Sequence, residues 1–291
     1  MNAQPLHVVA RSATTMTPPA EAANAVKVAK LIDISKCIGC KACQVACMEW
    51  NETRPTIGDN EGVYDNPRDL SANSWTVMRY NEIENDSGSI DWLIRKDGCM
   101  HCEDPGCMKA CPSPGAIQKL SNGIIDFNSE NCIGCGYCVQ GCPFNIPRIS
   151  STTNKATKCT LCSDRVQKGQ DPACVHTCPT KCLTFGPKDD QIKLAQDRLK
   201  DLQSRGFKNA KLYNPEGVGG THVMYVLPHG DSPEKYSGLP ANPSISPTVG
   251  MWKGILKPIA LISMAAAVLT GVVHYAVKGP NTVEEDDDIK A

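Results

Sequence analysis

Residues 132–143 read CIGCGYCVQGCP, and the spacing of their four cysteines decides the fold. The same arrangement, a C-x2-C pair followed by a C-x3-C pair, occurs four times between residues 37 and 178. Such an internal repeat predicts that one structural unit recurs along the chain. The four quartets are Cys37, Cys40, Cys43 and Cys47; Cys99, Cys102, Cys107 and Cys111; Cys132, Cys135, Cys138 and Cys142; and Cys159, Cys162, Cys174 and Cys178.

The spacing within each quartet is typical of iron–sulfur ligands. A cubane of four irons and four sulfides needs four thiolates, and three of them within one tight loop cover only one side. In the pattern C-x2-C-x2-C-x3-C-P, the fourth cysteine ligates the other cluster of a two-cluster unit. The third quartet matches this pattern fully, the first has Met48 in place of the proline, and the other two have longer central spacers. We therefore predict four [4Fe–4S] clusters in two modules.

We predict that the modules are nested, because the second and third quartets are close in sequence and their pairing closes a short loop at low entropic cost. The first quartet then pairs with the fourth, and each pair exchanges its last cysteines. The predicted ligands are Cys37, Cys40, Cys43 and Cys178 for cluster 1; Cys47, Cys159, Cys162 and Cys174 for cluster 2; Cys99, Cys102, Cys107 and Cys142 for cluster 3; and Cys111, Cys132, Cys135 and Cys138 for cluster 4.

Two other uses of cysteine compete with this prediction. Zinc sites also use C-x2-C pairs, but they normally supply two such pairs per ion, so zinc does not explain a third nearby cysteine in each repeat. The chain has 17 cysteines, and an odd number excludes complete disulfide pairing within it. Cys182 lies outside the quartets, four residues after Cys178, and we predict that it is a buried free thiol.

The rest of the composition narrows the class of protein. Thirty basic residues against 31 acidic ones give a net charge of −1, which argues against a nucleic-acid binder. Residues 1–25 lack the apolar core of a secretory signal, and we expect an arm that lies on a partner. Residues 259–277 carry no formal charge and would extend about 28 Å as a helix, close to the hydrocarbon thickness of a bilayer.

This C-terminal segment predicts a single transmembrane helix. Trp252, Lys253 and Lys257 flank one end, and Tyr275 and Lys278 flank the other, as in an interfacial belt. Ser263, Ala267 and Gly271 form a stripe of small residues, and we expect that stripe to pack on a helix of a partner subunit. His274 continues the same face, where a hydrogen-bonded interface residue is the commoner case and contact with a haem or quinone is the functional alternative.

These signals together predict an α+β chain of two tandem or nested bacterial two-[4Fe–4S] ferredoxin-like modules and a transmembrane helix. We expect strands at 29–35, 74–80, 88–94 and 181–186, a hairpin at 116–127, a strand ending at 227, a short helix at each C-x3-C segment, and a helix capped by Asp189 or Asp190 that ends near Gly206. The predicted domains are an N-terminal arm, 1–28; an outer module, 29–98 and 155–186; an inner module, 99–154; a helix, strand and linker, 187–246; the transmembrane helix, 247–279; and an acidic tail, 280–291.

A cluster with four cysteine ligands has no open position for substrate, so its default role is one-electron transfer. Four clusters in one chain predict an electron-transfer subunit without a catalytic centre of its own. Basic side chains beside the cysteines could raise cluster potentials by stabilising the reduced state, although solvated surface charges are commoner. The candidates are Lys36, Lys41, Lys96, Lys109, Lys158 and Arg165.

Several longer stretches, together with the quartets, resemble the iron–sulfur beta subunit of membrane-bound, nitrate-inducible formate dehydrogenases. They are SWTVMRY (74–80), WLIRKDGCMHCEDPGC (92–107), NPEGVGGTHVMYVL (214–227) and MWKGILKP (251–258), and the resemblance covers almost the whole chain. It implies a catalytic alpha subunit with a molybdenum or tungsten pterin, a membrane cytochrome b gamma subunit that reduces quinone, and a higher-order oligomer of this heterotrimer.

The resemblance also implies a place in the cell, the bacterial inner membrane with the cluster domain on the periplasmic side. The lysines at 253 and 257 argue for the opposite side by the positive-inside rule, but a folded export route need not obey it. Two other functions stay open at this point. The same electron-transfer subunit could serve another molybdopterin oxidoreductase, one that acts on sulfoxides or polysulfide. Alternatively, the cysteines could build a zinc-binding assembly scaffold.

Overall fold

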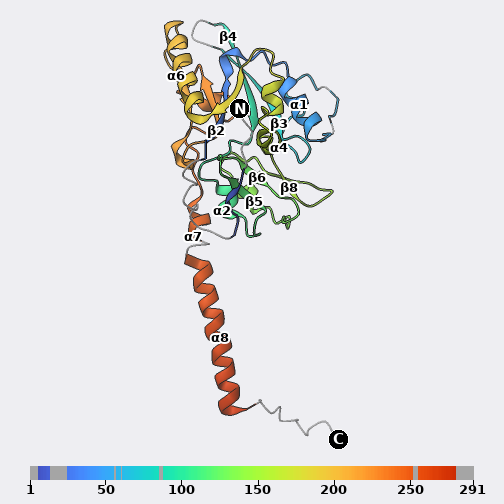
Figure 1. The fold of residues 1–291 in the computed structure, drawn as a ribbon, viewed down its shortest axis with the longest axis vertical. Coiled ribbons are helices and arrows are strands. Elements are labelled where there is room, and N and C mark those ends of the chain that lie inside the picture. Colours follow the sequence, from blue (N-terminus) through green and yellow to red (C-terminus); the bar gives the residue numbers. More distant parts are fainter. Residues whose placement is uncertain are drawn as a thin grey trace. The chain divides into compact units, whose positions relative to one another are not determined.

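The computed structural model describes residues 6–13, 25–55, 57–59, 61–84, 88–251 and 255–279. The chain divides into two compact units, Met1–Ser246 and Pro247–Ala291. The first unit contains every cysteine, and Figure 1 shows its strands and short helices. The second unit contains the helices α7 (Pro247–Met251) and α8 (Lys257–Lys278).

A four-stranded sheet organises one part of the first unit. Its order is β10 (Lys211–Tyr213), β11 (Val223–Leu227), β2 (Val28–Asp33) and β9 (Leu183–Pro187), with β2 parallel to β11 and antiparallel to β9. Every residue of β2 is buried because both of its faces are covered. The expected strands at 29–35 and 181–186 and the strand ending at 227 are thereby confirmed.

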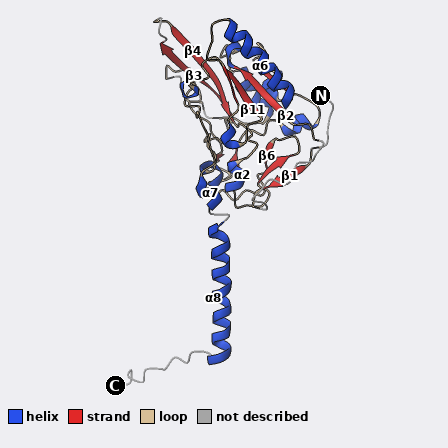
Figure 2. Cartoon of the chain, turned by 90° about the vertical axis from the view of Figure 1, so that its left-hand side faces the viewer, coloured by secondary structure: helices blue, strands red, loops and turns tan. Residues whose placement is uncertain are grey.

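Helix α6 (Lys188–Ser204) covers one face of this sheet (Figure 2). Ala195 and Leu202 of the helix pack against Ala29 and Leu31 of β2, as its apolar spacing predicts. The predicted cap is wrong, because Pro187 occupies the N-cap position and both aspartates lie inside the first turn. Carboxylates there still stabilise the helix through its dipole. The opposite face of β2 packs toward the cysteines through Val28 and Ile32.

A three-stranded sheet organises the second part, in the order β1 (Val8–Arg11), β5 (Ile117–Leu120) and β6 (Ile125–Phe127). The β5–β6 pair is the predicted hairpin. The described part of the N-terminal arm differs from the prediction, because β1 pairs antiparallel with β5 of its own chain. The Ser12 hydroxyl strengthens this attachment, since it donates to Ser113 O at 2.6 Å and accepts from Ile117 N at 3.1 Å.

A long antiparallel ribbon, β3 (Thr76–Glu84) and β4 (Ile90–Gly98), lies between the first two quartets in sequence. The predicted strands at 74–80 and 88–94 are confirmed, and each extends about four residues further. Gln44 joins the ribbon to the first quartet by accepting a hydrogen bond from Met78 N. The remaining strands, β7 (Arg148–Ile149) and β8 (Ala156–Thr157), form a short pair.

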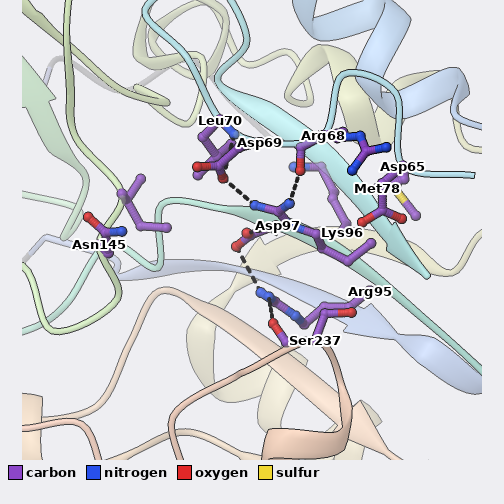
Figure 3. A network of polar contacts seen from close by, with 12 residues as sticks. Asp65, Arg68, Asp69, Leu70, Met78, Arg95, Lys96, Asp97, Asn145 and Ser237 are labelled. Atoms are coloured by element: carbon purple, nitrogen blue, oxygen red, sulfur yellow. Dashed lines mark hydrogen bonds and ion pairs between the residues drawn. The ribbon is translucent and has the colours of Figure 1, made fainter. Parts of the chain in front are cut away.

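The stretch 228–246, which we expected to be a linker, packs into the first unit. Tyr236 and Leu239 are fully buried in the core around the first and fourth quartets. Arg95 of β4 donates to Tyr236 O at 2.7 Å and Ser237 O at 3.3 Å, and it pairs with Asp97 at 2.8 Å (Figure 3). A buried guanidinium needs several acceptors, so these contacts attach the stretch to the ribbon.

In the second unit, α8 has 22 residues and is long and apolar enough to cross a membrane. All of its side chains are exposed. Ser263 and Thr270 satisfy their hydroxyls by donating to the carbonyl oxygens of Ile259 and Ala266, which suits an apolar surrounding. The predicted anchors Trp252 and Lys253 and the acidic tail lie outside the described residues.

Candidate metal centres

Each quartet begins with the same backbone turn. The third residue of every C-x2-C segment adopts a left-handed conformation; these residues are Gly39, His101, Gly134 and Leu161, with φ of 68°, 48°, 74° and 54°. The turn points the N–H of that residue at the sulfur of the first cysteine. Gly134 N lies 3.4 Å from Cys132 Sγ, and Leu161 N lies 3.3 Å from Cys159 Sγ. Such N–H groups stabilise a thiolate.

The second half of each quartet is a short helix, as predicted. The helices are α1 (Ala42–Trp50), α2 (Gly106–Ala110), α3 (Tyr137–Gln140) and α5 (Ala173–His176), and α4 (Ser163–Gln167) lies within the longer spacer of the fourth quartet. The third cysteine is the second residue of its helix in all four cases, Cys43, Cys107, Cys138 and Cys174. The repeat therefore reproduces one local geometry, in which three thiols face the same space.

Two of the predicted ligand sets line small pockets of their own. Cys47 of the first quartet lines a pocket together with three cysteines of the fourth quartet, Cys159, Cys162 and Cys174. Cys111 of the second quartet lines another pocket with three cysteines of the third, Cys132, Cys135 and Cys138. In both pockets the fourth thiol comes from the quartet with which the nested arrangement pairs it.

The two other predicted sets also lie close together. Burial raises the pKa of Cys102 well above its usual value, and the neighbouring thiols Cys99, Cys107 and Cys142 raise it further. In the last set, burial is the main cause that raises the pKa of Tyr80 to about 12. The neighbouring thiols Cys37, Cys43 and Cys40 raise it in the same direction. Cys178 reaches the same place from the fourth quartet, because its sulfur lies 3.6 Å from Cys182 Sγ and Cys182 hydrogen-bonds Cys37.

These four groups of thiols suit a multi-iron centre. All 17 cysteines are free thiols in the structure. Burial raises the pKa of Cys43 and Cys162 to about 12, so these thiols ionise at neutral pH only where a bound cation offsets the negative charge. Within the described residues, no three ligating side chains converge closely enough to hold a single ion. Four sulfurs around a pocket match the donor set of a [4Fe–4S] cluster.

Three buried lysines lie among the thiols. Lys30 of β2 has its Nζ 3.9 Å from Cys174 Sγ, Lys96 donates to Thr76 Oγ1 at 3.0 Å, and Lys158 donates to the carbonyl oxygens of Ile125 and Cys159. Burial opposes the charged state of Lys96, but Cys174, Cys43 and two further thiols raise its pKa. Buried cations at this place compensate negative charge on the thiolates.

Lys96 and Lys158 were among the candidates named from the sequence, but Lys30, seven positions before the nearest cysteine, was not. A lysine inside the apolar strand VAKLID was the available signal. The other four candidates are engaged at the surface. Lys36 pairs with Asp33, Lys41 donates to Tyr64 O, Lys109 pairs with Asp104, and Arg165 stacks on Trp50.

Two of the cysteines are more exposed than the others. Cys40 and Cys135 are the exposed cysteines, and they belong to the first and third quartets. Beside them, Ile38 and Ile133 are each 63% exposed. Both stretches read CIGC, so the same turn brings a thiol and an apolar side chain to the surface at two places. An exposed isoleucine beside an exposed ligand marks a surface that a partner could cover.

Comparison with known proteins places these features in context. Family models described as 4Fe-4S dicluster domains match residues 36–116 and 90–188, and one described as formate dehydrogenase N, transmembrane, matches residues 245–288. These matches confirm the predicted fold class of ferredoxin-like two-cluster domains with a C-terminal membrane segment. They overlap on the second quartet and leave the exchange of fourth cysteines as a prediction.

Three relatives are similar over nearly their whole length. The chain is 59% identical to the iron–sulfur subunit of nitrate-inducible formate dehydrogenase from Escherichia coli, over 97% of this chain and 96% of the relative. It is 58% identical to the formate dehydrogenase-O iron–sulfur subunit of the same organism, over 97% and 94%. It is 57% identical to a formate dehydrogenase iron–sulfur subunit from Haemophilus influenzae, over 97% and 91%.

Proposed function

Since this chain belongs to the family of formate dehydrogenase iron–sulfur subunits, we propose that it carries four [4Fe–4S] clusters. In this proposal it relays electrons from a formate-oxidising subunit with a molybdenum or tungsten pterin to a cytochrome b subunit that reduces quinone. An electron-transfer role follows from its iron–sulfur domains. The observation that carries the finer proposal is the gathering of 16 cysteines into four groups of four thiols.

The proposed ligands are the four sets named from the sequence. A [4Fe–4S] cluster with four cysteine ligands supplies one-electron transfer and offers no position for substrate. The protein's own groups support these ligand sets in two ways. Backbone N–H groups such as Gly134 and Leu161 donate to first-cysteine sulfurs, and the buried ammonium groups of Lys30, Lys96 and Lys158 lie close to the thiols.

We assign the two exposed turns to the two partners. Each turn presents an exposed cysteine beside an isoleucine that is 63% exposed. In this proposal one turn receives electrons from the catalytic subunit and the other delivers them to the membrane subunit.

The protein is a membrane-anchored subunit. We further propose that the cluster unit lies on the periplasmic side of the bacterial inner membrane and that the heterotrimer assembles into a larger oligomer. A cysteine introduced at the exposed Lys193 of α6, Lys193→Cys, tests the side through its reaction with a membrane-impermeant thiol reagent in cells permeabilised only at the outer membrane. Labelling only after the inner membrane is opened would place the unit in the cytoplasm.

The function is tested on the complex purified anaerobically from membranes. We expect about 16 irons for each copy of this chain, after subtraction of iron in the partners, and formate-dependent reduction of a dye. Oxidation of a reduced dye by a sulfoxide or polysulfide, together with no dye reduction by formate, would assign the chain to another molybdopterin enzyme. A colourless, zinc-loaded chain would favour the assembly scaffold.

A further inference from the structure

The residue four positions after the last cysteine differs between the two modules. In the outer module this position holds a side chain that can donate a hydrogen bond, Asn51 after Cys47 and Cys182 after Cys178. In the inner module it holds Gly115 after Cys111 and Ile146 after Cys142, which have no side-chain donor. The last cysteine of each quartet is the ligand that crosses to the paired cluster, so the difference affects all four crossing ligands.

Asn51 directs its amide at the first of these ligands. Its Nδ2 lies 3.6 Å from Cys47 Sγ and 2.8 Å from Cys47 O. The two contacts hold the side chain in one orientation at the C-terminal end of α1, where Asn51 is the C-cap residue. An amide N–H is a donor at this nitrogen, so the contact with sulfur has only one direction.

Cys182 occupies the matching place in the other half of the outer module. It is buried, its sulfur lies 3.6 Å from Cys178 Sγ, and it also hydrogen-bonds Cys37. Once Cys178 and Cys37 are thiolates, they can only accept, so Cys182 must be the donor.

We propose that Asn51 and Cys182 are positioning residues that raise the reduction potentials of the two outer clusters through hydrogen bonds to the thiolates of Cys47 and Cys178. The inference rests on the proposed function. A hydrogen bond to a ligand sulfur favours the more negative, reduced state of a cluster. Each outer cluster thereby receives a stabilisation of its reduced state.

Three variants of the whole complex test this inference. Cys182→Ala removes one donor, Cys182→Ser keeps a hydroxyl donor, and Asn51→Leu removes the other donor at similar volume. Asn209→Leu, on an exposed residue away from the cysteines, is the matched control. Iron and acid-labile sulfide are measured first, and each cluster potential is then obtained from a redox titration followed by low-temperature paramagnetic resonance.

We expect Cys182→Ala and Asn51→Leu each to lower the potential of one cluster, and a different one in each variant. The double variant should show both shifts, and Cys182→Ser should retain most of the wild-type value. Full iron and sulfide with unchanged potentials in both donor-removing variants would overturn the inference while leaving the proposed function intact. A shift of the same cluster by both variants would also overturn it. Wild-type protein without iron and sulfide would instead refute the proposed function.

Should Cys182→Ala fail to assemble its cluster, Cys182→Ser and Asn51→Leu still decide the question. In that case, a Cys182→Ser protein with the full metal content and the wild-type potential supports a donor role. An Asn51→Leu protein with full metal content and no potential shift contradicts it.

Discussion

The Lys30 ammonium lies 3.9 Å from the Cys174 sulfur, although 144 positions separate the two residues in the chain. Lys30 is 1% exposed, so water does not screen this contact. Burial opposes ionisation of Cys174, but Lys30 and Lys96 lower the pKa of that thiol below its usual value. The same positive charge must favour the reduced state of whatever centre Cys174 ligates.

Replacing Lys30 with methionine should therefore lower the potential of one cluster. A buried unit charge at this distance contributes on the order of 1–3 kcal/mol once spread over a cluster, which is about 40–130 mV for one electron. The measurement is a redox titration of the purified complex. Lys36→Met is the control, because the Lys36 side chain is 43% exposed and already paired with Asp33, and it should change every potential much less. Equal effects of the two variants would contradict the role of burial.

The exchange of crossing ligands can be tested with neighbouring cysteines. Cys174 and Cys178 lie four residues apart, yet we assign them to different clusters. Alanine at Cys178 should perturb the same spectroscopic signal as alanine at Cys37, whereas alanine at Cys174 should perturb the signal that alanine at Cys162 affects. A shared signal for Cys178 and Cys159 would show that the fourth quartet serves a single cluster and that the crossing assignment is wrong.

Alanine substitution should have different effects on cluster iron at two glycines of one turn. Both have positive φ, 74° at Gly134 and 77° at Gly136. A Cβ at Gly134 would lie 2.2 Å from Asn154 O, whereas nothing lies within 4 Å of a Cβ at Gly136. Lys41 adopts the conformation of Gly136 at the matching position of the first quartet, so a side chain is tolerated there. Gly134→Ala should lose about one cluster's iron, and Gly136→Ala should retain it; equal metal loss in both would contradict the steric argument.

The stripe of small residues on α8 predicts a packing surface in the membrane. Ala267 lies at its centre, between Ser263 and Gly271 one turn away on either side. Ala267→Leu should block close approach of a partner helix and reduce copurification of the cytochrome b subunit several-fold. Ala265→Leu places the same bulk on the opposite face and should leave copurification unchanged. A similar loss in both variants would show that the stripe does not define the interface.

Local spacing explains why so much of the cluster region could be predicted. Three cysteines within seven residues, as in 37–43 and 132–138, can face one space only if the backbone turns sharply, so the motif specifies both its turn and its short helix. The ribbon, the hairpin and the membrane helix were predictable for the same reason, because hydrophobic period and turn residues act over a few positions.

Contacts between segments that are distant in sequence could not be predicted from local spacing. Nothing near Lys30 in sequence shows that β2 carries it to Cys174, and nothing near Val8 shows that β1 completes the β5–β6 sheet. The polar stretch around Tyr236 resembles a linker until the carbonyls that Arg95 binds are seen. The quartets and their family were therefore determined by the sequence itself, since ligand spacing is a property of the local backbone. The buried charges and the donor at Cys182 were decided by the tertiary structure, since burial and hydrogen bonding depend on which remote segments pack together.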